Sequence, residues 1–398
     1  MTHAPPDSLL HHFRRAYGTR PTFAVRAPGR VTLVGAHVDY NDGCVLPAAI
    51  TRFVWLAVGP AGGDVSHVTA ADFDESVTLR VDASDPRLDA DGNPLPTWAL
   101  YPAGVAWVLR SAGLETPALN AVLTGDVPIG GGLSSSAAVE VAFAAVWQRL
   151  GGWRTSRIHL ARLCMKAERE VVGVASGLMD QFASLFGQKG HALLLDPRTL
   201  DWEALPLPSG TAIVVADTTT RRQLSDGGLN TRHAECREAI RLLKPHLPEI
   251  SALRDVTADD LNRLESHLPE PIRSRAGHVV GEIARVSEAA EALRHGDAAR
   301  LGALMNDSYA SSRDLYQSSG PELDAMWAAG NAHPACLGGR FVGAGFGGCV
   351  VFLTRADEAD KFVEETGRRY ALETGLQPDL YVVGAADGAQ VVPVEQNP

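Results

Sequence analysis

The sequence predicts an α+β protein built from two domains. Short runs that alternate apolar and polar residues, typical of strands, occur in both halves of the chain, and amphipathic stretches with helical periodicity separate them. The 398 residues, 45% of them hydrophobic, are enough for about two ordinary cores. Because strands and helices are intermixed and antiparallel connections are expected, the class is α+β.

The first half begins with a short amphipathic helix and continues with alternating strands. A segment rich in Asp, Pro and Gly, residues 82–96, predicts a loop. In chain order we expect a helix over 8–17, strands over 23–27, 31–34, 53–58, 65–70 and 76–81, a helix over 97–112 with Pro102 in its first turns, a strand over 121–125, helices over 134–150, 158–171 and 177–186, and a strand over 192–196.

The boundary between the domains is expected within residues 197–210, which carry three prolines and little periodicity. We therefore assign residues 1–205 to an N-terminal domain and residues 206–398 to a C-terminal domain. The second half is expected to contain strands over 212–216, 349–354 and 379–383, helices over 231–243, 276–295, 298–312, 321–333 and 356–374, and a glycine loop over 341–348.

Charge and cysteine usage exclude several classes of protein. The chain carries 36 basic and 47 acidic residues, a formal charge of −11, without a basic face or tail, so we expect neither nucleic acid nor an anionic membrane as a partner. The five cysteines are far apart and lack C-x-x-C spacing, which is typical of thiols in a reducing cytoplasm. With no secretory signal and no 18-residue apolar stretch, we expect a soluble, cytoplasmic protein.

The most specific motif is a run of glycines and serines after the strand expected at 121–125. Three consecutive glycines remove every Cβ, and the serines that follow open a helix. Unpaired backbone N–H groups at a helix start, with the positive end of the helix dipole behind them, form an anion site that a polyphosphate can approach closely. The pattern is neither a Walker A loop nor a Rossmann fingerprint, and a tight turn with one capping serine is the alternative. The candidate ATP-binding residues are Gly130, Gly131, Gly132, Leu133, Ser134, Ser135 and Ser136.

A second glycine-rich segment, residues 338–349, lies in the other half of the chain and contains Gly345 as a further candidate ATP-binding residue. On its own, this segment is equally consistent with a bulged hairpin. Together with the first loop, it predicts that two loops from separate domains enclose one phosphorylated ligand.

Two further segments place charged residues among apolar ones. Residues 26–41 concentrate Arg, His and Asp between expected strands, and residues 175–182 place a single carboxylate, Asp180, in a stretch of small and apolar residues. From the residues alone, Asp180 could be a helix cap or a catalytic base.

Taken together, these segments resemble the GHMP small-molecule kinase superfamily and, within it, the galactokinase family. The resemblance rests on residues 30–47, 128–138 and 339–349, on Gly-Leu-Met-Asp-Gln-Phe at 177–182, and on Leu-Leu-Leu-Asp at 193–196. It implies an N-terminal domain with a mixed sheet like the second domain of a small-subunit ribosomal protein, a C-terminal ferredoxin-like domain, and an active site in the cleft between them. It also implies MgATP and transfer of the γ-phosphoryl group to a sugar hydroxyl, in galactokinases the anomeric one.

The resemblance also implies roles for particular residues. Asp180 matches the catalytic aspartate, and Arg30 matches the arginine beside it. Such a pair makes physical sense, because the carboxylate can orient the attacking hydroxyl and accept its proton while the guanidinium offsets charge on the transferring group. Ser136 and Glu168 match the magnesium ligands, and one hydroxyl and one carboxylate, with phosphate oxygens and waters, suit Mg²⁺. From the residue alone, Glu168 would belong to a solvated helix face.

The positions implied to bind the sugar depart from the family pattern. Galactokinases carry Glu-His-Thr-Asp where this chain has Ala-His-Val-Asp at 36–39, and the family's substrate-binding tyrosine falls on a leucine. In the family, that glutamate contacts the hydroxyl on the sixth carbon of galactose, and the aspartate holds ring hydroxyls. Each lost hydrogen bond to a sugar costs about 1–3 kcal/mol, so galactose should be a poor substrate. The implied substrate-binding residues are Ala36, His37, Asp39, Gly177 and Leu229.

We therefore expect a sugar 1-kinase whose pocket is enlarged beyond the sixth carbon, where Ala36 leaves space. The expected substrate is a galacto-configured aldose with a longer tail, for example an eight-carbon sugar as in the octose pathway to lincosamide antibiotics. The alternatives are an ordinary galactokinase, another branch of the superfamily acting on an inositol, heptose or uronic acid, and a non-catalytic regulator that senses sugar and ATP. Intact Asp180, Arg30, Ser136 and Glu168 count against the regulator. We expect a monomer.

Overall fold

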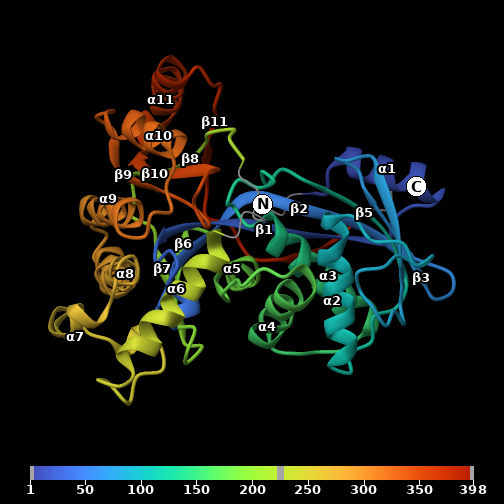
Figure 1. Ribbon diagram of the computed structural model, residues 1–398. Coiled ribbons are helices and arrows are strands. Elements are labelled where there is room, and N and C mark those ends of the chain that lie inside the picture. The colour runs from blue at the N-terminus through green and yellow to red at the C-terminus, as the bar shows by residue number, and fades with distance from the viewer. Residues whose placement is uncertain (1–3, 222–227, 395–398) are drawn as a thin grey trace.

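The first half of the chain is built on a mixed sheet. The computed structural model describes residues 4–221 and 228–394 (Figure 1). Among these residues, six strands form the sheet, in which only one pair of neighbours is parallel. In sheet order they are β12 (Gln390–Pro393), β1 (Phe23–Val34), β2 (Leu46–Pro60), β5 (Leu119–Gly125), β3 (Val65–Ala70) and β4 (Glu75–Arg80), and β3 and β5 are the parallel pair.

Helices cover both faces of this sheet. One face carries α2 (Thr97–Ser111), α3 (Ser135–Gly151), α4 (Arg157–Ala167) and α5 (Met179–Phe186), of which α3 and α5 pack directly on β1 and β2. The opposite face is covered by α1 (Asp7–Tyr17), whose buried Leu9 and Phe13 pack against Phe53 and Trp55 of β2. Since every residue of β1 is buried, this strand lies in the middle of the first half.

The second half is built on an antiparallel sheet. In the part of the chain that the structure describes, it consists of β11 (Asp379–Val383), β8 (Thr211–Asp217), β10 (Cys349–Arg355) and β9 (Cys336–Phe341), in that order. Numbered in chain order, the strands lie 4-1-3-2, and helices follow the first and third, as in a ferredoxin-like β-α-β-β-α-β unit. Helices α10 (Pro321–Asn331) and α11 (Ala359–Thr374) pack on one another and on this sheet.

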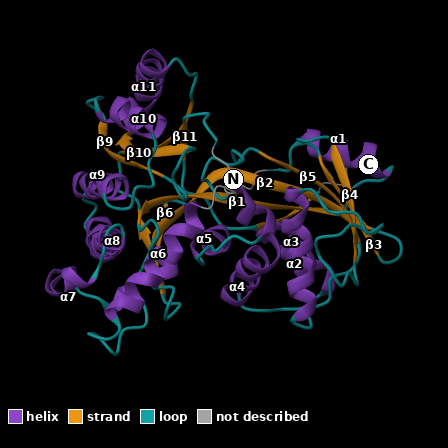
Figure 2. Cartoon of the chain, viewed as in Figure 1, coloured by secondary structure: helices purple, strands orange, loops and turns teal. Residues whose placement is uncertain are grey.

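Further helices come between β8 and β9 in the chain. They are α6 (Gly228–Leu243), α7 (Ala258–Leu264), α8 (Ile272–Arg294) and α9 (Ala298–Asp314). Helix α9 packs on β9 and α8, and α8 also contacts α6 and β1. Figure 2 shows helices and strands mixed through both halves, which confirms the α+β class. Among the described helices, none is both long and apolar enough to cross a membrane.

Several predicted boundaries differ from the observed ones. The strands expected at 23–27 and 31–34 are one strand, β1, because Pro28 and Gly29 fit into a bulge where the register with β2 shifts. The segment expected to be an irregular boundary, 197–210, contains β7 (Trp202–Pro206), which forms a hairpin with β6 (His191–Leu195). The division into domains at residue 205 stays a prediction.

Besides β7, two further strands were not predicted, because neither has an alternating apolar pattern. The first is β9, which contains Gly338 and Gly339 and pairs with β10 across the glycine loop, so the bulged-hairpin alternative describes the backbone there. The second is β12, which lies near the end of the sequence yet pairs with β1 of the first sheet. Residues 168–172, expected to continue an α-helix, form a π-helical turn, Glu168–Val172.

The contact between α9 and β9 predicts the effect of a single methyl group. A Cβ on Gly302 of α9 would lie 2.2 Å from the carbonyl oxygen of Leu337, whereas a Cβ on Gly277 of α8 would meet nothing within 4 Å. We expect Gly302→Ala to lower the free energy of unfolding by about 1–3 kcal/mol through overpacking. The matched control, Gly277→Ala, should raise it by roughly 0.5–1 kcal/mol. Chemical denaturation measures both, and a Gly302→Ala protein as stable as the parent would contradict this packing.

Candidate active site

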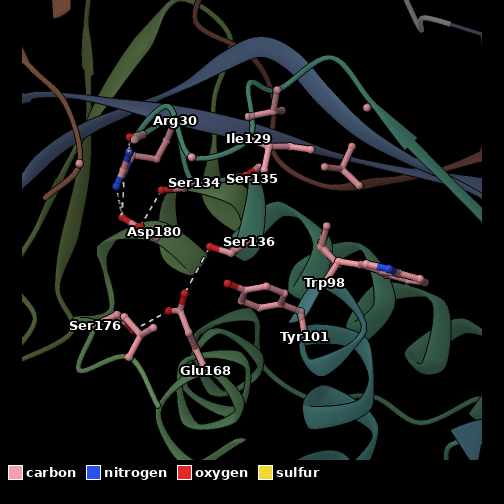
Figure 3. A pocket seen from close by; sticks show the side chains of 18 of the residues that line it. Arg30, Trp98, Tyr101, Ile129, Ser134, Ser135, Ser136, Glu168, Ser176 and Asp180 are labelled. Atoms are coloured by element: carbon pink, nitrogen blue, oxygen red, sulfur yellow. Dashed lines mark hydrogen bonds and ion pairs between the residues drawn. The ribbon is translucent and has the colours of Figure 1, made fainter. Parts of the chain in front are cut away.

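A cavity of about 350 Å³ lies where the two glycine-rich loops meet (Figure 3). The loop that leads into α3 contributes to its lining, and so do Val342, Gly343, Ala344, Gly345 and Gly347 of the loop between β9 and β10. Arg30 and Asp180 lie at one end of the labelled group, and Trp98 and Tyr101 of α2 lie at the other. The predicted site residues in the lining are Arg30, Gly130, Gly132, Ser134, Ser135, Ser136, Glu168, Asp180, Leu229 and Gly345.

The backbones of the two loops approach each other closely. A Cβ on Gly132 would lie 2.5 Å from the carbonyl oxygen of Val342, and the backbone N–H of Cys349 donates to Gly131 at 3.1 Å. Gly132 also has a φ of 80°, a conformation that disfavours other residues. The structure thus brings together the loops that the sequence predicts to face one ligand.

Two of the predicted ATP-binding residues are occupied with protein contacts. Leu133 is fully buried, and its carbonyl oxygen accepts a hydrogen bond from the backbone N–H of Arg30. Gly131 lies against Cys349. Both residues fix the shape of the loop and do not line the cavity. Leu133 does so because its apolar side chain is stabilised by packing into the core, and Gly131 does so through its backbone contact with Cys349.

Asp180 is held in place by two side chains. The Nε of Arg30 donates to Oδ1 of Asp180 at 2.8 Å, and the hydroxyl of Ser134 donates to Oδ2 at 2.6 Å (Figure 3). The Arg30 side chain is only 4% exposed, whereas that of Asp180 is 24% exposed and reaches the cavity. Since both oxygens have a fixed partner, the carboxylate has one orientation towards a ligand.

Ser134 has a role that the sequence did not predict. It precedes α3 in the position of a cap, but its φ is 59° and its side chain makes no capping hydrogen bond. The hydroxyl is turned towards Asp180 instead. The alternative of a simple capping serine is therefore wrong for Ser134, because the left-handed backbone directs the side chain away from the helix.

Glu168 collects three hydrogen-bond donors. The hydroxyl of Ser136 donates to Oε1 at 3.3 Å, and the hydroxyl of Ser176 donates to Oε2 at 2.5 Å (Figure 3). The side-chain amide of Gln181 donates to the same Oε2 at 3.0 Å. The structure thus places Ser136 and Glu168, which the sequence pairs as metal ligands, side by side. Ser176 and Gln181 went unpredicted, because a lone Ser or Gln gives no periodic signal.

Carboxylates concentrate on this side of the cavity. Burial raises the pKa of Glu168, and the nearby Asp180 raises it further. Glu140 of α3 is fully buried, so its pKa lies well above the usual range, and it accepts from Gln181 at 2.9 Å. Within the described ranges, no group of three or more His, Cys, Asp or Glu residues could hold a metal ion by itself. A cation here would need further oxygens from a ligand.

Asp39 lies close to Asp180. It begins a 3-10 turn, Asp39–Asn41, and its Oδ2 accepts from the backbone N–H of Met179 at 3.4 Å. A Cβ on Gly177 would lie 1.7 Å from that same oxygen, so only glycine fits at this position. Burial raises the pKa of Asp39 to about 6, and Asp180 adds to the effect.

Ala36 and His37 are placed differently from the sequence-based expectation. The backbone N–H groups of Gly35 and Ala36 donate to the buried carboxylate of Glu282 on α8, at 2.8 and 3.2 Å. Both ring nitrogens of His37 have protein partners, the hydroxyl of Tyr40 and the carbonyl oxygen of Ala344. As far as the structure is described, neither residue is part of the cavity lining. The prediction that His37 contacts the sugar is therefore not supported by its ring contacts.

Leu229 does line the cavity. It lies in the first turn of α6, and Ala344 and Gly345 of the second glycine loop belong to the same lining. The next residue, Asn230, accepts through its side-chain oxygen from the backbone N–H of Ala175 at 3.3 Å. The start of α6 is thus tied to the segment that leads to Asp180, and Leu229 presents an apolar surface there.

The other end of the cavity is apolar. Trp98 and Tyr101 of α2 and Ile129 contribute to it, together with Phe73. Phe73 is 44% exposed and Ile129 58% exposed, unusual values for large apolar side chains. The indole N–H of Trp98 donates to Glu75 at 2.6 Å, so its ring has a fixed orientation at the mouth of the cavity.

Three known family signatures match the chain. They are the galactokinase galactose-binding signature at residues 11–60, the GHMP kinase N-terminal domain at 101–188 and the GHMP kinase C-terminal domain at 289–372. The galactokinase of Roseiflexus sp. (strain RS-1) is 42% identical over 380 residues, which cover 96% of this chain and 95% of that protein. The chain belongs to the GHMP kinase superfamily, among the galactokinases. It is thus a sugar kinase, a phosphotransferase of a superfamily that uses ATP.

Solved structures of this superfamily agree with the fold. Lactococcus lactis galactokinase complexed with galactose superposes with a TM-score of 0.89 at 30% identity and covers 96% of this chain and 98% of its own. The mevalonate kinase of Methanococcus jannaschii has a TM-score of 0.65 at 15% identity, with 93% of this chain covered and 100% of its own. The second likeness concerns the fold alone. The two-domain GHMP kinase fold is thereby confirmed.

The raised pKa of Asp39 predicts a pH-dependent stability. Because its folded value of about 6 exceeds the usual 3.8, the folded protein binds this proton more tightly, and stability is lost as pH rises from about 4 to about 6. Asp39→Asn removes that loss. The free energy of unfolding of the variant minus that of the parent should therefore be about 1–2 kcal/mol larger at pH 7.5 than at pH 4.5.

Asp196 provides a control whose pKa is shifted in the opposite direction. Burial opposes the shift, but hydrogen bonds, above all from Arg254, lower the pKa of Asp196 below the usual 3.8. Its contribution to stability is therefore complete above about pH 4 and is lost only at lower pH, so the difference between Asp196→Asn and the parent should stay nearly constant between pH 4.5 and pH 7.5. Denaturant unfolding at both pH values measures the two differences. An Asp39→Asn difference that is the same at pH 4.5 and pH 7.5 would show that Asp39 titrates normally.

Proposed function

We propose that the chain transfers the γ-phosphoryl group of MgATP to the anomeric hydroxyl of a galacto-configured aldose that extends beyond the sixth carbon. The observation that carries this proposal is the position of Asp180. Its carboxylate is fixed by Arg30 and Ser134 and reaches the cavity next to a glycine loop suited to phosphate.

In this proposal the nucleotide occupies the length of the cavity. Its phosphates lie against the backbone N–H groups of the loop from Gly130 to Ser136, at the start of α3, where the helix dipole favours negative charge. Its base lies at the apolar end, between Trp98 and Ile129, whose exposed surfaces it would cover. The net charge of −11 is no obstacle, because the local donors are backbone amides and Arg30.

The chemistry of two side chains suits Mg²⁺. Glu168 and Ser136 offer a carboxylate and a hydroxyl oxygen 3.3 Å apart at the cavity wall, and Mg²⁺ commonly takes one or two protein ligands in addition to phosphates and water. The raised pKa of Glu168 indicates an acidic group that a cation would stabilise in its charged form. When bound, Mg²⁺ would neutralise charge on the phosphates. Ser176 and Gln181 would hold Glu168 in position for it.

Asp180 and Arg30 would act on the reacting hydroxyl. The carboxylate accepts a hydrogen bond from the anomeric hydroxyl, orients it towards the γ-phosphate and receives its proton. Arg30 also donates to the carbonyl oxygen of Gly132, so it links the carboxylate to the phosphate loop. Its positive charge stabilises negative charge on both sides of the transfer.

The sugar would lie between Asp180 and α6. Asp39, next to Gly177, is placed to accept hydrogen bonds from ring hydroxyls. Leu229 supplies apolar surface where a tyrosine hydroxyl would bind galactose. Since neither Leu229 nor Ala36 offers a side-chain hydrogen bond, a sugar with carbons beyond the sixth, such as an octose, would gain contact area there, and its product would be the 1-phosphate.

Galactose itself is the second candidate substrate. The proteins that match over nearly the whole chain are named galactokinase, and the galactose-binding signature covers residues 11–60. The position of Ala36, away from the cavity lining within the described residues, also weakens the argument that its small side chain enlarges the pocket.

The proposed role of Asp180 predicts a separation of turnover from binding. Asp180→Asn keeps the size and one hydrogen-bond acceptor for Arg30 but cannot take a proton, so turnover should fall by about 10²–10⁴-fold. Binding of a fluorescent ATP analogue should change less than threefold, because the phosphate loop is untouched. Turnover close to that of the parent would remove Asp180 from the mechanism.

The substrate is identified by measuring ADP release with a panel of aldoses of six, seven and eight carbons. We expect the highest kcat/KM for a galacto-configured aldose longer than six carbons. Leu229→Tyr, alone and with Ala36→Glu, should shift the preference towards galactose by roughly 10-fold, the effect of one regained hydrogen bond of about 1–3 kcal/mol. If the parent turns over galactose as readily as longer aldoses, it is an ordinary galactokinase. If no aldose gives ADP release, the sugar-kinase proposal fails.

A further inference from the structure

A continuous series of hydrogen bonds runs from α6 to the second glycine loop. Sγ of Cys236 lies 3.2 Å from the hydroxyl oxygen of Tyr316, which lies 2.9 Å from that of Tyr40. The Tyr40 oxygen is 2.8 Å from Nδ1 of His37, and Nε2 of His37 is 3.1 Å from the carbonyl oxygen of Ala344. We call these five residues, Cys236, Tyr316, Tyr40, His37 and Ala344, the His37 chain.

Every hydrogen bond of the His37 chain has a fixed direction. The carbonyl oxygen of Ala344 can only accept, so Nε2 of His37 carries a proton. Burial lowers the pKa of His37 to about 3, so the ring is neutral and Nδ1 accepts. The single proton of the Tyr40 hydroxyl is therefore donated to His37, Tyr316 donates to Tyr40, and the thiol of Cys236 donates to Tyr316. The chain is satisfied along its whole length in this one arrangement.

The His37 chain joins two segments that belong to opposite sides of the site. His37 is fixed to the turn Asp39–Asn41, because the side-chain amide of Asn41 donates to the His37 carbonyl oxygen at 3.0 Å. At the other end, Ala344 stands between Gly343 and Gly345, both with positive φ, in the loop that lines the cavity. Two adjoining glycines give such a loop freedom that an anchor at Ala344 removes.

Both the backbone and the side chain of His37 are constrained at this position. Its φ is 62°, an uncommon conformation for a residue other than glycine, and its side chain is nearly fully buried. The centroid of the ring also lies 4.7 Å from that of Tyr316, with the two rings tilted by 38°, and the backbone carbonyl of Tyr316 accepts from Arg232 at 2.7 Å. A backbone conformation of this kind costs free energy and persists where the surrounding contacts require it.

We propose that His37 is a positioning residue that couples nucleotide binding to sugar binding. The inference rests on the proposed function for the assignment of the two sides: Ala344 to the nucleotide and Asp39 to the sugar. A nucleotide that orders the loop around Ala344 holds the His37 ring, and the ring holds the turn that carries Asp39. The sugar then meets a turn that has already lost its conformational freedom, so each ligand strengthens binding of the other.

The test measures whether binding of a nucleotide alone makes residues 36–42 more rigid. Hydrogen–deuterium exchange of the full-length protein is measured with and without a non-hydrolysable ATP analogue and Mg²⁺. In the parent we expect the analogue to slow exchange both in residues 342–348 and in residues 36–42. In His37→Asn, which tolerates the left-handed backbone but is too short to reach Ala344, the slowing in 36–42 should fall at least about fivefold. That in 342–348 should persist.

A matched pair of variants separates coupling from general destabilisation. Tyr40→Phe breaks the His37 chain without changing the backbone, so it should reproduce the loss in residues 36–42 even if His37→Asn folds poorly. Tyr309→Phe removes another tyrosine hydroxyl, one bonded to Asp324 in the core of the second sheet, and should respond like the parent. Equal slowing of 36–42 in the parent and both His37-chain variants would overturn the inference, as would no slowing in the parent.

This readout is independent of the sugar. If no aldose is turned over while the analogue still protects residues 36–42 through His37, the proposed function fails, and the transmission of order from Ala344 to residues 36–42 stands. If aldoses are turned over normally but protection is not transmitted, the coupling fails and the proposed function stands.

Discussion

The contact between the backbones of two glycine loops is the constraint on which the site depends. A Cβ on Gly132 would lie 2.5 Å from the carbonyl oxygen of Val342, and a Cβ on Gly348 would lie 2.7 Å from that of Gly131, so neither position has room for a side chain. One loop belongs to the first half and the other to the second, so this contact sets how the two halves meet. It also brings the start of α3, Arg30 and Asp180 to the same wall as Gly345. Any residue larger than glycine at Gly132 would force these two backbones apart.

A buried ion pair reinforces the junction between the two halves beside Gly35 and Ala36. Glu282 of α8 is fully buried, yet it accepts hydrogen bonds from the backbone of Gly35 and Ala36, and from Ser308. Arg340 of β9, also fully buried, pairs with it at 3.1 Å, and charges of this kind lower the pKa of Glu282 to about 2 despite burial. Such a pair is costly to desolvate, so it contributes orientation more than stability.

The residues of the candidate site were easier to propose from the sequence than several of the strands around them. The glycine loops could be proposed from the residues themselves. The pairing of Asp180 with Arg30 and of Ser136 with Glu168 came from the resemblance to the family, and the structure places each pair within hydrogen-bond distance. Glu282 and Gln181 could not be predicted, since their partners lie on distant elements and a single polar residue in a helix carries no pattern. The same reason applies to the ring of His37: the resemblance implies a sugar contact, which stays a prediction, but the partners that packing supplies to the ring, Tyr40 and Ala344, could not be foreseen.

Strands were missed where tertiary pairing outweighs local preference. The prolines near β7 and the glycines in β9 disfavour strands locally, yet both strands are stabilised by hydrogen bonds to a neighbour that itself has strong strand character. Helix boundaries were closer, because periodicity extends over more residues. The π-helical turn at Glu168 lies outside any such pattern and coincides with the group that reaches the cavity.

The pairing of β12 with β1 has a consequence for how the protein is made. Arg26 of β1 bonds to Gln390 of β12, 364 residues further along the chain. On the ribosome, β1 emerges early, and its outer edge then stays without a neighbour through the synthesis of nearly the whole chain. An unpaired edge on a buried strand is a site for wrong pairing with other chains. Between the synthesis of β1 and that of β12, a nascent chain of this enzyme is thus most exposed to wrong pairing with other chains.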